Sequence, residues 1–257
     1  MKLALSLPLV LWLSGIASAQ AELSALEIMR HTDQDHRAND ERGEVDMVLV
    51  DKDDQRQQRK LEIMTKKGEG DDDKTLIRFL EPPTVRGTAV LTHEATGRAD
   101  DQWLYLPALQ KKKRIASSNR TQRFAGTDFT FEDIRSEDFT AYDYSKVGEE
   151  VIDRQSCYVI EAKPKDPSTS GYSKRKIYVE KERFLIHKIE YFDQRERHQK
   201  TLELRRFVQV SGLWRAEQSM MSDHLRGTKT VWRFSSREIN PGLPDSAFTE
   251  RALERGN

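Results

Sequence analysis

Apolar and polar residues alternate along most of the chain. In residues 44–51, Val45, Met47 and Leu49 share one face, while Asp46 and its alternate neighbours lie on the other. A period of two residues predicts β-strands. The same pattern predicts about ten strands in all, including residues 59–65, 75–83, 87–94, 101–109, 158–164, 174–181, 185–193, 200–210, 212–223 and 229–238.

Two segments depart from this alternation. Residues 22–37 have apolar side chains at helical spacing, among them Leu23, Leu26, Ile28 and Met29, which predicts an N-terminal helix. Residues 115–144 contain several Phe and Tyr residues without a regular period. We interpret this second segment as a long irregular insertion with short helical pieces.

These elements predict a mainly β protein of the α+β class. The turns between the later strands are short and polar, which indicates antiparallel hairpins, and no helices alternate with strands as in a parallel nucleotide-binding sheet. An antiparallel sheet of this many strands must curl. We therefore expect a curled antiparallel sheet whose concave face the N-terminal helix and the middle insertion cover. A covered concave face is a common place for a ligand.

The N-terminus has the three parts of a cleavable export signal. Lys2 is followed by a mostly apolar run over residues 3–16, and Ala17 and Ala19 supply small residues before a cleavage site. We expect residues 1–19 to be removed and residues 20–257 to form a single domain. The one cysteine, Cys157, lies far from the cleavage site, so we expect no lipid anchor there and no internal disulfide. The expected location of the mature protein is outside the cytoplasm, in solution.

Composition and motifs narrow the function further. Lys+Arg and Asp+Glu are equal at 43 each, a balance that does not favour nucleic-acid binding. The sequence has no HExxH, no cysteine cluster, no GxSxG and no glycine-rich phosphate loop. We therefore expect no catalytic residues, no metal site and no cofactor, and a protein that is not an enzyme.

A basic run, Lys111, Lys112, Lys113 and Arg114, follows the strand predicted over residues 101–109. One interpretation is a solvated turn whose charges protect the end of a strand. The other is a docking patch for an acidic partner or for anionic lipid headgroups. The run itself does not decide between them.

Three segments together resemble a known family. They are FLEPPTVRGTAVL (79–91), DQWLYLPALQKKKRI (101–115) and RFAGTDFTFEDI (123–134), and the ending INPGLPDSAFT is also similar. The chain resembles LolA-like outer-membrane lipoprotein-sorting proteins, in a branch associated with RND/MMPL-type inner-membrane exporters. The resemblance implies an open half-barrel and a periplasmic carrier that holds acyl chains. The cargo implied is a lipoprotein, a free lipid or another hydrophobic molecule.

The more uniformly apolar faces of the early strands supply the candidates for a ligand cavity, which are Val45, Met47, Leu49, Leu61, Ile63, Ile77, Phe79, Leu104 and Leu106. The same residues could instead pack beneath the helical covers. Two functions fit the sequence. The first is a monomeric carrier of acyl chains that contacts membranes transiently at most. The second is a non-carrier accessory or sensor protein that docks on an RND/MMPL-type exporter.

Overall fold

Thirteen antiparallel strands form one open sheet in the computed structural model, which describes residues 22–68, 72–98, 100–116 and 119–254. The strands are β1 (Asp40–Val50), β2 (Arg56–Lys67), β3 (Asp73–Glu81), β4 (Ala89–His93), β5 (Asp101–Leu106), β6 (Lys111–Ile115), β7 (Tyr142–Ile152), β8 (Gln155–Pro164), β9 (Tyr172–Glu180), β10 (Ile186–Asp193), β11 (His198–Val210), β12 (Leu213–Asp223) and β13 (Thr228–Ile239). The helices are α1 (Ala25–Gln34) and α2 (Glu250–Glu254), with short 3₁₀ turns η1 (Pro107–Leu109), η3 (Phe124–Gly126), η4 (Pro167–Thr169) and η5 (Asp245–Phe248).

The first and the last strand of the chain are neighbours in the sheet. Its order is β6-β5-β4-β3-β2-β1-β13-β12-β11-β10-β9-β8-β7, so β1 pairs with β13 at the centre while β6 and β7 form the two edges. The register aligns apolar residues across strands: Ile63 lies opposite Ile77, which lies opposite Val90, and Val90 lies opposite Leu104. Because side chains alternate between faces, such rows keep one face of the sheet apolar.

The predicted fold class is confirmed, but the sequence did not predict the two strands at the edges of the sheet. The structure adds β6 and β7 to the strands that the sequence predicted. Both are edge strands with mostly exposed side chains, so they lack the buried apolar face that makes a strand recognisable. The N-terminal helix is also shorter than predicted, at Ala25–Gln34. Ile28 and Met29 are buried while Leu26 is 37% exposed.

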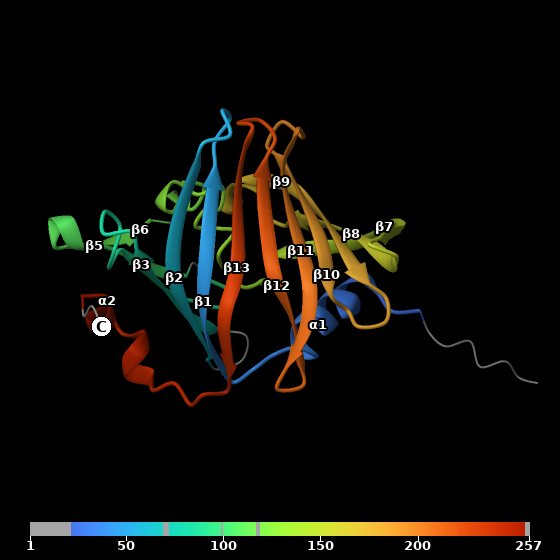
Figure 1. Ribbon diagram of the computed structural model, residues 1–257. Helices are drawn as coiled ribbons and strands as arrows, with labels where there is room; N and C mark the ends of the chain where they lie inside the picture. Colours follow the sequence, from blue (N-terminus) through green and yellow to red (C-terminus); the bar gives the residue numbers. More distant parts are fainter. Residues whose placement is uncertain (1–21, 69–71, 99, 117–118, 255–257) are drawn as a thin grey trace, which may run out of the picture.

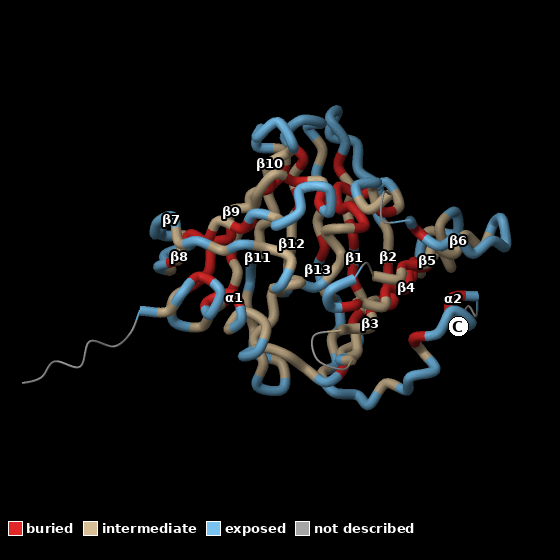
Figure 2. The backbone as a smooth tube through the Cα atoms, turned by 180° about the vertical axis from the view of Figure 1, so that it is seen from behind, coloured by how far each residue is buried: buried red, intermediate tan, exposed pale blue. Residues whose placement is uncertain are grey.

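The two faces of the sheet are covered by different segments (Figures 1 and 2). We call the face covered by α1 and by residues 116 and 119–141, the insertion, the inner face. It contains the main core, to which the helix contributes Ile28 and Met29 and the insertion contributes three phenylalanines. The C-terminal tail packs on the opposite, outer face, where Phe248 and Leu253 cover Leu76 and Leu91.

The expected export signal, residues 1–19, lies outside the described residues. Among the residues that are described, no helix has the length and apolar character needed to span a membrane.

Candidate ligand cavity

A cavity of about 580 Å³ lies between the insertion and the inner face of β9, β10 and β11. Its strand-borne wall is apolar and aromatic, made by Tyr142, Tyr172, Ile186, Ile189, Tyr191 and Leu202. The opposite wall is polar and comes mainly from residues 132–141 of the insertion. The volume falls in the usual range for small-molecule sites, roughly 300–1,000 Å³.

The other half of the inner face is closed by aromatic side chains of the insertion. The ring of Phe124 lies 5.5 Å from that of Phe79 on β3, and the ring of Phe129 lies 4.5 Å from that of Trp232 on β13. Phe131 contacts Phe124 at 6.0 Å, and all three phenylalanines are buried. This packing fills the hollow over β1–β5 and β13, so the open space is displaced towards β9–β11.

Acidic side chains fasten the insertion to the sheet, and the first is Asp128. Its carboxylate accepts hydrogen bonds from the hydroxyls of Thr228 at 2.5 Å and Thr230 at 2.7 Å, both on β13. Arg123 of the insertion also donates to it, at 3.1 Å. Hydrogen bonds to a charged group are stronger than those between neutral groups. Asp128 therefore holds its part of the insertion against β13, at the centre of the sheet.

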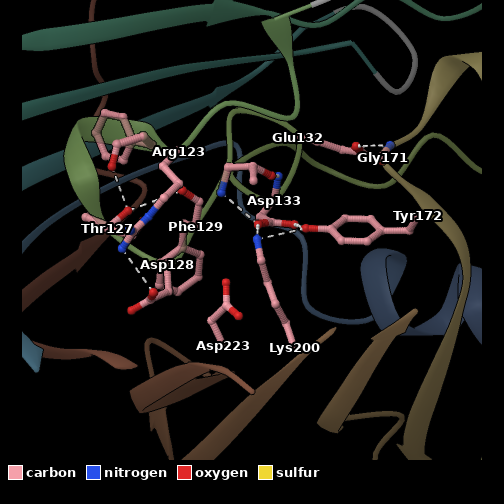
Figure 3. Close-up of polar contacts among 12 residues, drawn as sticks. Arg123, Thr127, Asp128, Phe129, Glu132, Asp133, Gly171, Tyr172, Lys200 and Asp223 are labelled. Carbon is pink, nitrogen blue, oxygen red and sulfur yellow. Dashed lines mark hydrogen bonds and ion pairs between the residues drawn. The ribbon is translucent and has the colours of Figure 1, made fainter. Parts of the chain in front are cut away.

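The second fastening is a buried group of three residues (Figure 3). The Asp133 carboxylate lies 3.0 Å from the Lys200 ammonium of β11 and accepts a hydrogen bond of 2.7 Å from the Tyr172 hydroxyl of β9. Lys200 also donates to the Tyr172 hydroxyl, at 3.0 Å, and the Asp133 side chain is 0% exposed. Burial and the neighbouring Asp133 hold the pKa of Tyr172 well above its ordinary value, so its hydroxyl remains a donor.

A third fastening joins the insertion to the turn between β8 and β9. Glu132 accepts hydrogen bonds from the Ser170 hydroxyl and from the Gly171 N–H, the latter at 2.8 Å (Figure 3). A side chain at Gly171 would begin 2.7 Å from a methyl carbon of Thr121, so the glycine lets the insertion approach this closely. The turn and the insertion therefore form one wall of the cavity.

A fourth acidic residue, Glu137, pairs with a cation inside the cavity. Its carboxylate accepts two hydrogen bonds from the Arg175 guanidinium of β9, at 2.7 and 2.9 Å, and one from the Tyr144 hydroxyl at 2.5 Å. The guanidinium lies over the Tyr142 ring, 4.2 Å from its centroid. Burial opposes the charge on Arg175, but Glu137 and Tyr142 outweigh it and hold the guanidinium pKa well above its ordinary value.

A small pocket beside the cavity shares Arg135 and Ser136 with it and is also lined by Glu94 and Asp100. Glu94 accepts a hydrogen bond of 2.7 Å from the backbone N–H of Ser136 in the insertion. Burial raises the pKa of the Glu94 carboxyl to about 7, against the effect of the Ser136 N–H, and the charges of Asp73 and Asp100 add to the rise. Arg135 pairs with Asp100 beside it. This neighbouring pocket therefore contains a carboxyl whose pKa lies near neutral pH.

Helix α1 covers the inner face beyond the cavity, at the end of the sheet that includes β7 and β9. The helix begins with a capping box, in which the Ser24 hydroxyl accepts from the Glu27 N–H and Glu27 accepts from the Ser24 N–H. Its His31 ring stacks on Phe184 at 4.5 Å. The helix therefore has its own local stabilisation in addition to its packing.

Comparison with known proteins identifies the family. A protein-family model described as "Uncharacterized protein" matches residues 71–255. A domain from Vibrio parahaemolyticus, assigned as an outer membrane lipoprotein-sorting protein, is 33% identical with a TM-score of 0.86, over 90% of this chain and 98% of that one. The chain belongs to this LolA-like outer-membrane lipoprotein-sorting family.

Other solved structures agree with this membership. A DUF1329 family protein from Desulfovibrio piger is 30% identical with a TM-score of 0.85, over 89% of this chain and 97% of that one. A LolA superfamily protein from Nitrosomonas europaea, 24% identical with a TM-score of 0.72 over 90% of this chain and 100% of that one, shares the fold. A search of curated proteins finds no significant match.

The residues that the sequence predicted for the cavity of this family member lie mostly in its core. Eight of them belong to the inner-face core or pack against it: Val45, Met47, Leu49, Leu61, Ile63, Ile77, Phe79 and Leu104. Leu106 is half-buried near the end of β5. None of the nine is among the residues around the 580 Å³ cavity. Contact between these side chains and a cargo stays a prediction.

The basic run forms β6, an edge strand, rather than a turn. Because a strand alternates its side chains between the two faces, the four cations do not form one patch. Lys112 pairs with Glu250 of α2 at 2.8 Å, and Arg114 pairs with Asp101 of β5. Docking by this run stays a prediction, and the observed placement gives β6 the charged side chains that protect exposed sheet edges.

The sequence did not reveal the charged residues around the cavity. Glu137 and Asp133 lie in a segment without regular period, and Arg175 and Lys200 lie in strands rich in charge. Both cations occupy inward positions of their strands. Arg175 lies opposite Tyr191, and Lys200 lies opposite Asp223. A strict assignment of strand faces would have placed both inside. Within the described residues, no group of three or more side chains suited to bind a metal is found.

Proposed function

We propose that this protein is a periplasmic carrier that shields the acyl chains of a lipid or lipoprotein during transport towards the outer membrane. The observation that supports the proposal is the 580 Å³ cavity with an apolar inner wall, set between the insertion and β9–β11. The sorting role of the Vibrio parahaemolyticus relative agrees with it. In this proposal residues 20–257 form one domain, and residues 1–19 direct export.

The energetics of an acyl chain explain what such a cavity must do. Each buried CH₂ group contributes roughly 0.8 kcal/mol, so a 16-carbon chain in water costs on the order of 10 kcal/mol. A water molecule occupies about 30 Å³ of liquid, so the cavity has room for roughly 20 atoms of that size. One acyl chain fills it. A cargo with several chains requires α1 or the insertion to move away from the inner face.

Reversible shielding also fits the construction of the walls. The strand wall is part of a continuous sheet, whereas the opposite wall is an irregular segment fastened by side chains. Segments of this kind open at lower cost than strands at the centre of a sheet. Loading and release then need no covalent chemistry, which fits a non-enzymatic protein.

The second candidate is a non-carrier accessory or sensor protein that docks on an RND/MMPL-type exporter. The observation that favours it is the edge strand β7, where the side chains of Val147 and Val151 are 49% and 66% exposed. A strand at a sheet edge can receive an additional strand from another protein. Docking alone fits both candidates, because a carrier must also meet a donor, so the two are distinguished by whether the protein binds a hydrophobic ligand.

Mass spectrometry tests the carrier function most directly. The protein is isolated gently from the periplasm, extracted with organic solvent and analysed for lipids, and the extracted protein is titrated with a fluorescent 16-carbon fatty acid. We expect a co-purified lipid and saturable uptake. The absence of both a co-purified and an exchangeable hydrophobic ligand would reject the carrier function.

A pair of variants locates the uptake. Ile189→Trp places a large ring where Ile189 borders the cavity and should reduce uptake at least tenfold. Phe192→Trp makes a similar change on the same strand, at a position beside Lys174 and His198 that does not border the cavity, and should leave uptake unchanged. Equal uptake by both variants, each shown to be folded by circular dichroism, would place the ligand elsewhere.

A further inference from the structure

The cavity contains a buried cation whose counter-ion comes from the insertion and not from the sheet. We propose that Arg175 binds the anionic headgroup of a single-chain amphiphile, and that Glu137 occupies the headgroup position while the cavity is empty. The inference rests on the proposed carrier function and specifies its cargo: one acyl chain with a carboxylate or phosphate group.

The geometry of Arg175 is that of a preformed anion receptor. Two of its nitrogens point in parallel at the two oxygens of Glu137, at 2.7 and 2.9 Å, an arrangement that a ligand carboxylate or phosphate can reproduce. Its third nitrogen, Nε, is buried and has no hydrogen-bond partner among the described residues. The Tyr142 ring fixes the plane of the guanidinium. Arg175 therefore has an unused donor and a fixed orientation within the cavity wall.

Glu137 is the more exchangeable member of the pair. It lies in residues 136–138, which belong to neither a helix nor a strand, whereas Arg175 lies within β9 between β8 and β10. Movement of Glu137 breaks no ladder of the sheet. A bound anion in its place keeps the buried guanidinium paired, and this avoids the penalty for an unpaired buried charge. A neutral headgroup cannot make the exchange.

The surroundings of Arg175 define the rest of the cargo. Ile186, Ile189 and Leu202 border the same cavity, so an acyl chain can lie along them while its headgroup meets the guanidinium. The volume of about 580 Å³ suits one chain. The cavity walls contain acidic and basic residues in similar numbers, so selection for an anion depends on the specific pair and not on net charge.

Binding measurements on the full, delipidated chain test the inference. Three probes share a 16-carbon chain: hexadecanoate, 1-palmitoyl-lysophosphatidate and the neutral 1-monopalmitoylglycerol. Titration calorimetry below their micelle concentrations, at pH 8, gives each dissociation constant. We expect the wild type to bind both anionic probes more tightly than the neutral one. Acetate and inorganic phosphate are titrated alone, and affinity equal to that of the chain-bearing probes would overturn the amphiphile assignment.

Variants of the pair separate a receptor from a structural contact. Glu137→Gln removes the internal competitor and should increase affinity for both anionic probes about tenfold, with no change for the neutral probe. The double variant Arg175→Met with Glu137→Gln leaves no unpaired buried charge and should bind all three probes equally. Glu41→Gln is the matched control, because Glu41 pairs with Arg215 at 2.8 Å and Arg237 at 3.0 Å away from the cavity. It should leave the preference for anions unchanged.

The outcomes distinguish this inference from the carrier function. If the wild type binds all three probes with equal affinity, or if the double variant keeps a preference for anions, the headgroup assignment is wrong and the carrier function stands. If Glu137→Gln raises affinity for the neutral probe as much as for the anionic ones, Glu137 only blocks the entrance. If none of the probes binds to any variant, the single-chain assignment is wrong, and the carrier function is rejected with it only if no lipid co-purifies with the protein.

Discussion

The buried group of Asp133, Lys200 and Tyr172 allows a quantitative prediction about how firmly the insertion is held. Asp133→Asn keeps the shape of the side chain but removes its charge. Lys200, whose side chain is 3% exposed, then lacks its counter-ion. Removing one partner of a buried ion pair costs about 3–5 kcal/mol. Since native domains are stable by only about 5–15 kcal/mol, this is a large fraction of the total.

The reciprocal change should cost less. In Lys200→Met, the Asp133 carboxylate keeps its hydrogen bonds from the Tyr172 hydroxyl and the Thr130 N–H, both at 2.7 Å. We expect a loss of about 2–3 kcal/mol, because those donors still compensate the charge. The double variant has no unpaired charge and should lose about 1–2 kcal/mol. The two single effects therefore should not add, with a coupling of at least about 2 kcal/mol.

Urea denaturation measures these differences. Far-UV circular dichroism follows the sheet, and tryptophan fluorescence reports on Trp232, which contacts Phe129 of the insertion. Lys60→Met is the control, because it breaks a pair with Glu44 in which both side chains are more than 30% exposed, and it should cost far less than either single variant. Single variants that each lose less than about 1 kcal/mol, or that add within about 0.5 kcal/mol, would refute the reasoning.

Two further predictions concern Glu94, in the small pocket beside the cavity, and α1. Because burial raises the folded-state pKa of Glu94 to about 7, above its ordinary value near 4.5, the folded state binds that proton more tightly than the unfolded state. The wild type should therefore lose stability as pH rises from about 4.5 to 7, and Glu94→Gln should be more stable than the wild type at pH 8, by up to about 3 kcal/mol, but not at pH 4. Melting temperatures across this pH range check it, and parallel curves for the two proteins would contradict it. Ser24→Ala removes the cap of α1 and should lower the free energy of unfolding by about 1 kcal/mol, measured by urea denaturation, with Ser173→Ala as a control outside the helix. An unchanged urea midpoint would show that packing alone holds the helix.

The sequence alone determined the class of fold, because a strand buried on one face has alternating apolar and polar residues. Val45, Leu61 and Phe79 are buried side chains on neighbouring strands, and each was assigned to the inner face before its neighbours were known. The family resemblance through residues 79–91, 101–115 and 123–134 is likewise a property of sequence. The sequence did not predict the edge strands β6 and β7. Their side chains are mostly exposed and polar, so they lack the alternation of buried apolar and polar positions.

Only the tertiary structure decided where the cavity lies. The insertion could have covered either half of the inner face, and its local sequence does not say which. Phe124 and Phe129 fill the half over β1–β5 and β13, where the sequence had placed the ligand, while Asp133 and Glu137 reach β9 and β11 and leave space between them. Two ion pairs fix this arrangement. Arg175 lies 38 positions after Glu137 in the chain, and Lys200 lies 67 positions after Asp133. Charges so distant along the chain become partners only once the sheet has formed, and burial then makes each pairing obligatory.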